Sequence, residues 1–442
     1  MLRRIAISCL VVAGMAPAQA RTRPHYGDVL RVEIAGDPWQ RPGGVARRLV
    51  LDGLTEEGPD GSIRPGLAVS WTAENNEHRW QFRLRSGVHF HDGSAVTSTA
   101  VAASLMSACA AKCPWGSIHA LGASIVFTSD EPMRQLPALL AGDEFLIAKP
   151  GATSDGGSGP FQVSGFRNSV LTLTANDSSW QGRPFLDGIE IRVHRAVSDQ
   201  WMDLAAGRAD LVEVPAERIR QAQQQHLSPM ISSPVEVLAL ELQDSGALAS
   251  AALRSAIGYA IDRGALANVI FQRQGIPAAA LLPQNVSGFA FLFSADRDLN
   301  KAHELRGGAT SPALQLEADG DGALQLAAQR IVLNLREAGF NLQMARPGAG
   351  QPAMRLRLLR VESTDPAADL AQMTRAAAIA LPVFSSDSAA VYRAERELLE
   401  RKTLIPLLDL PLAYAVGTRV RDLQLQVDGM PDLASVSLEP SR

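Results

Sequence analysis

The chain has few cysteines, few aromatic residues and no strong excess of charge of either sign. Only 3 of its 442 residues are cysteine, 5% are aromatic, and the formal net charge is −4. No basic stripe appears, which argues against a nucleic-acid partner. The sequence also lacks a G-x-S-x-G elbow, a P-loop and an H-E-x-x-H pair, which are signatures of common enzyme classes. With 46% hydrophobic residues, the chain is long enough for two large lobes or several domains.

The one long apolar run lies at the N-terminus. Arg3 and Arg4 precede the apolar stretch IAISCLVVAGMAP, and the small residues AQA follow at Ala18–Ala20. This order predicts a cleaved secretory signal over residues 1–20. Cleavage would remove two arginines, so the mature net charge would be −4 − 2 = −6. No later apolar run reaches the ~18 residues of a transmembrane helix, and we therefore expect a soluble protein exported to the periplasm.

The three cysteines fit export. Cys9 lies inside the predicted signal, too early in the apolar run to be the lipid-modified residue of a lipoprotein. Cys109 and Cys113 remain, as CAAKC, and an isolated pair in an oxidising compartment is most simply a disulfide. The spacing is not the C-x-x-C of redox proteins. We therefore expect a structural bridge at the end of a helix, with a redox-active pair as the alternative.

The stretch VHFHDG at residues 88–93 could suggest a metal site. His89 and His91 would share a face on a strand, and imidazole suits zinc, copper and nickel. Two ligands do not make a site, however, because a structural zinc site normally has four. The alternating residues before the stretch predict a strand, DGS predicts a turn, and Thr97 is a plausible N-cap of a helix. We expect the two histidines to be turn and edge residues, with no metal and no cofactor.

The order of predicted elements indicates two lobes. A long strand at Val235–Leu242 separates a strand-rich first part from a helix-rich second part. Residues 44–57 look helical, and a second helix buries Leu324, Ala328, Ile331, Leu335 and Ala338 at helical spacing before Gly339 ends it. The strands and helices alternate as in a mixed α/β lobe, and the C-terminal tail is again strand-rich. The prediction is a bilobal α/β fold joined by a two-stranded hinge, with ligands favouring the cleft.

Several motifs recur in one order along the chain. They are GLTEEGPDGSIRPGLAVSWT, FRLRSGVHFHDGSAVTSTAVAASL, GSGPFQV, LDGIEIRV, LAAGRADLVEV, LRSAIGYAIDRGAL, GIPAAALLP and DLNKAHEL. In these motifs the chain resembles the family 5 bacterial extracellular solute-binding proteins, which are the dipeptide-, oligopeptide- and nickel-binding proteins of ABC importers. The resemblance covers most of the mature chain. It includes the Phe-His-Asp-Gly stretch, which it assigns to architecture.

The resemblance implies a periplasmic-binding-protein fold of two mixed α/β lobes, the first strand-rich. We expect a first lobe over residues 21–240, with residues 405–442 returning to it, and a second lobe over 241–404. The resemblance also implies that the protein catalyses no reaction. The protein would capture a short peptide or similar solute and pass it to an ABC permease in the inner membrane, and we expect it to be a monomer.

The resemblance also suggests ligand-binding residues. Peptide-binding relatives hold the α-ammonium with an aspartate that follows a Gly-Trp strand and precedes Asp-Pro by three residues. Here the Gly-Trp is missing, Asp365-Pro366 is kept, and Glu362 takes the position of the aspartate. A carboxylate there can pair with an ammonium group, and the alternative is a solvated loop residue.

Three further residues are weaker candidates for the cleft. Trp39 could stack on a ligand or belong to the core. Gly159 and Pro160 match a Gly-Pro turn that would shape the backbone near the cleft.

Other functions stay open. The second lobe is short for the family, and that together with the missing Gly-Trp leaves room for a degenerate member acting as a sensor or chaperone. A receptor for a metal chelate or a sugar would have the same fold. An exported enzyme, such as a hydrolase or a disulfide protein using the cysteine pair, is the alternative from another class, and it lacks a recognisable catalytic set.

Overall fold

The computed structural model describes residues 24–40, 44–58, 60–109, 113–152, 156–294, 296–308, 313–320, 322–346, 352–381 and 384–439. The predicted signal peptide, residues 1–20, lies outside these ranges, as does Cys9. Among the described residues, no helix combines the length and apolar character needed to cross a bilayer.

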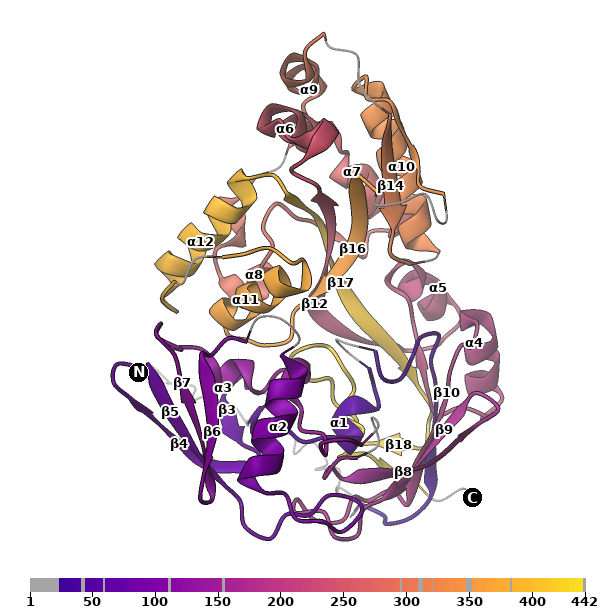
Figure 1. Ribbon diagram of the computed structural model, residues 1–442. Helices are drawn as coiled ribbons and strands as arrows, with labels where there is room; N and C mark the ends of the chain where they lie inside the picture. The colour runs from indigo at the N-terminus through magenta and orange to yellow at the C-terminus, as the bar shows by residue number, and fades with distance from the viewer. Residues whose placement is uncertain are drawn as a thin grey trace, which may run out of the picture.

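An 11-stranded mixed sheet runs through both parts of the described molecule (Figure 1). In spatial order its strands are β15 (Leu342–Met344), β14 (Leu314–Ala318), β16 (Met354–Arg360), β12 (Met230–Leu242), β17 (Leu404–Val416), β11 (Leu211–Glu213), β1 (Val29–Glu33), β10 (Gly188–Arg192), β9 (Val170–Ala175) and β8 (Phe161–Arg167), with β13 (Ile276–Pro277) pairing with β17. The pairs of β1 with β10 and of β14 with β16 are parallel, whereas β12 and β17 are antiparallel.

The first lobe adds three smaller sheets. They are β4 (Ala68–Glu74), β5 (Arg79–Leu84), β7 (Ser124–Thr128) and β6 (Ser117–Leu121); β2 (Thr55–Glu57) with β3 (Ile63–Pro65); and β18 (Val420–Arg421) with β19 (Ser437–Leu438). Its helices are α1 (Arg47–Val50), α2 (Ser98–Ala108), α3 (Leu136–Leu139), α4 (Val197–Ala205) and α5 (Ile219–Gln224). This lobe occupies the lower half of Figure 1, and its strand-rich character agrees with the sequence.

The second lobe contains the remaining helices. These are α6 (Ala251–Ala260), α7 (Arg263–Ala265), α8 (Gln284–Ser287), α9 (Leu299–Arg306), α10 (Ala323–Glu337), α11 (Pro366–Ala376) and α12 (Ser388–Glu400). The predicted bilobal α/β fold is confirmed, and β12 and β17 run between the two lobes (Figure 1).

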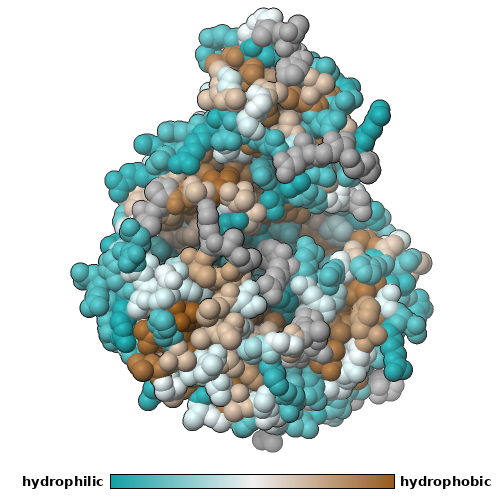
Figure 2. All heavy atoms as spheres, viewed as in Figure 1, coloured by the Kyte–Doolittle hydropathy of each residue, from teal (hydrophilic) through white to brown (hydrophobic). Residues whose placement is uncertain are grey.

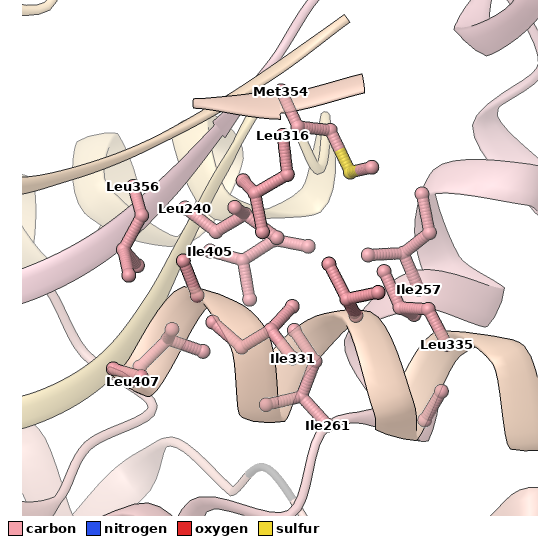
Figure 3. Packing of buried hydrophobic residues seen from close by; sticks show 14 of the residues in the cluster. Leu240, Ile257, Ile261, Leu316, Ile331, Leu335, Met354, Leu356, Ile405 and Leu407 are labelled. Carbon is pink, nitrogen blue, oxygen red and sulfur yellow. The ribbon is translucent and has the colours of Figure 1, made fainter. Parts of the chain in front are cut away.

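The strand β12 explains why this part of the sequence is almost continuously apolar. Val237 and Ala239 pack toward α8, α11 and α12, whereas Leu238, Leu240 and Leu242 pack toward α6 and α10. Successive side chains of a strand point to opposite faces, so helices on both faces bury every second residue on each side. Figure 3 shows the second of these interfaces, where the strands contact one face of α10.

The expected helix before Gly339 is confirmed. Ala328, Ile331, Leu335 and Ala338 have no exposed surface, while Leu324 is only partly buried. Gly339 has a φ of 83°, a conformation that glycine adopts without steric cost and that ends many helices. Thr97 is also confirmed as an N-cap, because its side chain accepts a hydrogen bond from the backbone N–H of Ala100.

The prediction of a helix over residues 44–57 is wrong except for one turn. Only α1 is helical there, and the chain is extended from Leu51 onward. Asp52 forms a β-bridge with Ile147, and a Cβ at Gly53 would lie 2.5 Å from the carbonyl oxygen of Thr55. Contacts with distant parts of the chain thus outweigh the local helical periodicity.

Candidate ligand cleft between the lobes

A small cavity, which we call the inter-lobe cavity, lies where β16 and α11 meet the first lobe. Its volume is about 290 Å³, and Figure 2 shows the molecular surface hollowed between the two lobes. The first lobe contributes Ala108, Asp143 and Glu144, and the second contributes Arg357, Leu358, Leu359, Arg360, Glu362, Gln372, Met373, Arg375 and Ala376. Carboxylates and arginines thus face each other across the lobe contact.

Glu362 follows the end of β16 and lines this cavity. Only 7% of its surface is exposed, and its Oε2 accepts a hydrogen bond of 3.3 Å from the backbone N–H of Asp143 in the first lobe. The backbone N–H groups of Glu362 and Ser363 both donate to Asp369 Oδ1, at 2.9 and 3.0 Å. Glu362 is therefore held rigidly at the lobe contact, and the alternative that it is a solvated loop residue is wrong.

Burial raises the pKa of Glu362 to about 7, and the nearby carboxylate of Asp143 adds to this rise. The positive charge of Arg48 lowers the pKa of Glu362 and so acts in the opposite direction. Within the described part of the chain, no lysine, arginine or histidine nitrogen forms an ion pair with Glu362 within 4.0 Å. Arg48 instead pairs with Asp143, with its Nε 2.9 Å from Oδ1. Glu362 is thus a buried carboxyl whose hydrogen-bond donors are neutral groups.

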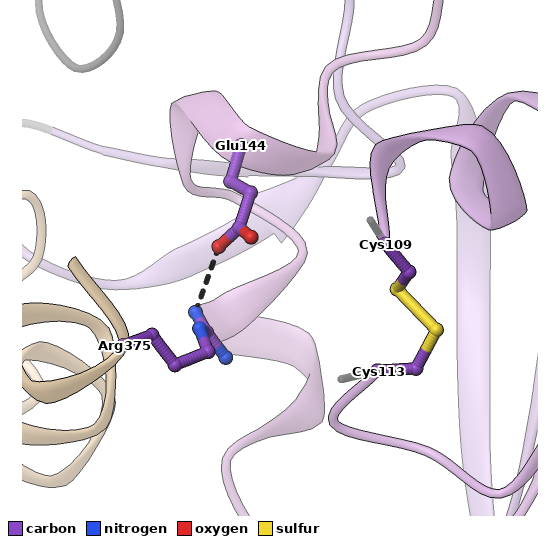
Figure 4. The surroundings of a disulfide bond; sticks show 4 residues. All are labelled: Cys109, Cys113, Glu144 and Arg375. Atoms are coloured by element: carbon purple, nitrogen blue, oxygen red, sulfur yellow. Dashed lines mark ion pairs between the residues drawn. A yellow bond between two sulfur atoms is a disulfide. The ribbon is translucent and has the colours of Figure 1, made fainter. Parts of the chain in front are cut away.

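An ion pair crosses the lobe contact near Glu362. Arg375 of α11 lies 3.0 Å from Glu144 of the first lobe (Figure 4). Ala368, also on α11, is fully buried among residues of the first-lobe core. The lobes therefore meet through apolar as well as charged groups.

Two further cavities adjoin this region. One, of about 220 Å³, lies beside the junction of β1, β11, β12 and β17, and Arg360 lines both it and the inter-lobe cavity. Arg360 is paired there with Glu236 at 3.0 Å.

The other cavity, the first-lobe cavity, has a volume of about 550 Å³ and includes Asp52, Glu56, Trp180 and residues 430–435. Asp143 lines it as well as the inter-lobe cavity, so the two are neighbours. Burial and the adjacent Asp52 raise the pKa of Glu56 to about 7.

The structure separates the other sequence candidates. Trp39 packs partly against the first-lobe core and is not among the residues that line these three cavities. Pro160 lines the first-lobe cavity. A Cβ at Gly159 would lie 2.8 Å from the carbonyl oxygen of Leu49, which explains why a glycine is needed at this position. Ligand-binding roles for all three residues stay predictions.

The VHFHDG stretch forms a tight turn. The backbone N–H of Phe90 donates to the carbonyl oxygen of Ser94, and His91 Nε2 lies 3.0 Å from the carbonyl oxygen of Gly159. His89 is exposed. Within the described ranges, no group of three or more His, Cys, Asp or Glu side chains could hold a metal ion.

Cys109 and Cys113 form a disulfide. Cys109 caps the C-terminus of α2, and its Cα lies 5.1 Å from that of Cys113, to which it is joined by a disulfide (Figure 4). The neighbouring Ala108 lines the inter-lobe cavity, so the bridge lies close to the lobe contact.

Sequence reasoning missed the first-lobe side of this site. No sequence motif marks Asp143, Glu144 or Arg48 as functional, because these residues gain their role only from contact with the second lobe. The available signal was a pair of acidic residues directly after an apolar stretch.

Fold and site together define a two-lobed binding protein with a polar cleft. A family model, "Bacterial extracellular solute-binding proteins, family 5 Middle", matches residues 62–350. The chain belongs to this family, as its motifs indicated.

Known relatives are distant. A probable D,D-dipeptide-binding periplasmic protein of Escherichia coli (strain K12) is 24% identical over 263 residues, which cover 53% of this chain and 51% of the relative. The chain therefore spans about half the length of this relative. A periplasmic binding protein from Helicobacter pylori, in complex with the peptide STSA, aligns with a TM-score of 0.80 and 19% identity, covering 94% of this chain and 99% of the other. A Staphylococcus aureus protein in complex with Ni(L-His)2 aligns with a TM-score of 0.76 and 17% identity, covering 93% and 100%.

Proposed function

We propose that this protein is the extracytoplasmic receptor of an ABC importer and that it captures a short peptide, or a similar solute with a cationic group, between its lobes. The observation that carries the proposal is Glu362, a buried carboxyl at the lobe contact with neutral donors around it. The names of the peptide-binding relatives support the same class of solute.

The physical argument rests on desolvation. A carboxylate in a closed cleft has lost most of its water, and an ammonium group with hydrogen bonds to it would restore that lost stabilisation. The inter-lobe cavity can accept such a group, and the adjoining first-lobe cavity offers space for the rest of a short solute. Asp143, which lines both, marks the connection between them.

Export and partners follow from the same proposal. A receptor of this kind would be cleaved after Ala20, act as a monomer in the periplasm, and dock on a permease in the inner membrane. It would bind its solute without altering it. Edman sequencing of the exported protein should begin at Arg21, and an N-terminal lipid-modified Cys9 would contradict a freely diffusing periplasmic protein.

Native mass spectrometry of the protein purified from its own periplasm tests the solute class. We expect a co-purifying mass that fragments as a short peptide, and we expect dipeptides and tripeptides to raise the melting temperature. A nickel–histidine complex and a set of sugars serve as comparison ligands. Stabilisation by one of these, with none by any peptide, would overturn the proposal in favour of the chelate or sugar receptor.

A further inference from the structure

The two strands that join the lobes have an irregular point in their pairing. On the first-lobe side, Tyr414 of β17 pairs with Glu213 of β11. On the second-lobe side, Glu236 of β12 pairs with Arg360 of β16. Between these two points Pro234 lies opposite Pro411, and the register of β12 with β17 shifts on both sides of Pro234.

Two prolines opposite each other weaken the hydrogen bonding between β12 and β17 at this position. Proline has no backbone N–H, so neither Pro234 nor Pro411 can donate a hydrogen bond to the other strand. The neighbouring β11–β17 and β12–β16 ladders are regular and belong to different lobes. The β12–β17 ladder has one further register shift, between Leu238 and Ala239, inside the second lobe. Bending at this point therefore disrupts fewer hydrogen bonds than bending within either lobe.

A polar contact far from this point in sequence holds the lobes together. Thr364, just before α11, donates from its backbone N–H to Glu57 Oε1 at 2.7 Å, and its hydroxyl donates to the same oxygen at 2.5 Å. The hydroxyl also lies 3.1 Å from the carbonyl oxygen of Gly61. Glu57 and Gly61 belong to the β2–β3 hairpin of the first lobe.

Gly61 allows this close approach. Its φ is 76°, and a Cβ built there would lie 2.3 Å from Thr364 Oγ1. A methyl group at this position could fit only if Thr364 moved away from the hairpin. The β2–β3 hairpin and Thr364 are thus shaped to touch.

We propose that the lobes open and close about the Pro234–Pro411 pair, and that the contact of Thr364 with Glu57 and Gly61 is the latch of the closed form. The latch uses only groups of the protein, so it stabilises closure whichever solute is bound. With this hinge, the chain passes from one lobe to the other near residues 235 and 411, a few residues from the boundaries expected from the sequence.

Single-molecule energy transfer between the lobes tests the latch. Dyes on Leu121→Cys in β6 and Glu400→Cys in α12 would report the distance across the latch side of the molecule (Figure 1), since both residues are exposed. Cys109 and Cys113 stay oxidised and do not react.

The decisive comparison is between two glycine variants. In Gly61→Ala the population with the longer inter-dye distance should increase strongly. Gly87→Ala is the matched control, because Gly87 has a φ of 75° but nothing within 4 Å of its added Cβ. It carries the same backbone strain without the steric conflict and should keep the distance distribution of the parent.

A milder variant covers the case in which Gly61→Ala does not fold. Thr364→Val removes the hydroxyl donor and should lower the ratio of closed to open molecules roughly fivefold, the equivalent of one ordinary hydrogen bond. Hydrogen exchange should then show faster exchange at the Asp143 amide, which donates across the lobes, and unchanged protection in β11 and β16. Unchanged distances in Thr364→Val would overturn the latch. Loss of protection throughout β16 would overturn the hinge.

Discussion

Replacement of Glu362 by glutamine should raise folding stability and lower affinity for a cationic solute. The two effects have opposite signs because the carboxylate is costly in the folded protein and useful only to a ligand. Glutamine has nearly the same shape and can still accept the hydrogen bond from the Asp143 amide. The substitution therefore removes the charge and leaves the packing largely intact.

The stability effect follows from the pKa. Folding raises the pKa of Glu362 from its ordinary value of 4.5 to about 7, chiefly through burial. The contribution of Glu362 to the free energy of unfolding is therefore fully present below pH 4.5 and is lost as the pH rises through about 7. At about 1.4 kcal/mol per pKa unit, the ionised side chain costs on the order of 3 kcal/mol above pH 8. The Glu362→Gln variant should therefore be more stable than the parent protein by most of this amount at pH 8 and by almost nothing at pH 4.

The affinity effect should be larger. Removing one partner of a buried ion pair costs about 3–5 kcal/mol, which is hundreds- to thousands-fold in the dissociation constant. Isothermal titration calorimetry at pH 8 with the best-binding peptide measures it, alongside urea unfolding at both pH values. Glu131→Gln is the control, since Glu131 is exposed and should change either quantity by less than about 0.5 kcal/mol.

Two results would refute this reasoning. An unchanged dissociation constant would remove Glu362 from the ligand site, and with it the main residue-level argument for a peptide. An equal loss of stability at pH 4 and pH 8 would show that the carboxyl makes favourable contacts in both protonation states.

Three other substitutions test separate features. Replacing Cys109 and Cys113 with serine should cost stability at the low end of about 0–5 kcal/mol, because the bridge closes a very short loop, and calorimetry should show unchanged peptide affinity. Ile331→Ala should lower the unfolding free energy in urea by about 2–5 kcal/mol, since Ile331 is fully buried against the sheet; a loss below 1 kcal/mol would contradict the described packing. Burial raises the pKa of Asp409 to about 7, so Asp409→Asn should reduce the fall in stability between pH 4 and pH 8, and an unaltered pH profile would show that this carboxyl is not buried in solution.

The sequence by itself determined the local elements whose pattern is strong. The spacing of apolar residues in α10, the cap at Thr97 and the turn in VHFHDG could all be inferred, because each depends on residues within a few positions of one another. The family motifs extended this to the fold, and they predicted that Glu362 stands where peptide-binding relatives have their ammonium anchor.

Only the tertiary structure decided what surrounds Glu362. The short α1 and the extended chain after it depend on a bridge to Ile147, almost a hundred residues away. The Asp143 amide that donates to Glu362 and the Glu57 carboxylate that accepts from Thr364 come from the first lobe. They are distant in the sequence from their partners, so no local pattern predicts these contacts. Burial creates the raised pKa of Glu362 by excluding water, and exclusion of water arises only when two lobes, each with its own core, come into contact.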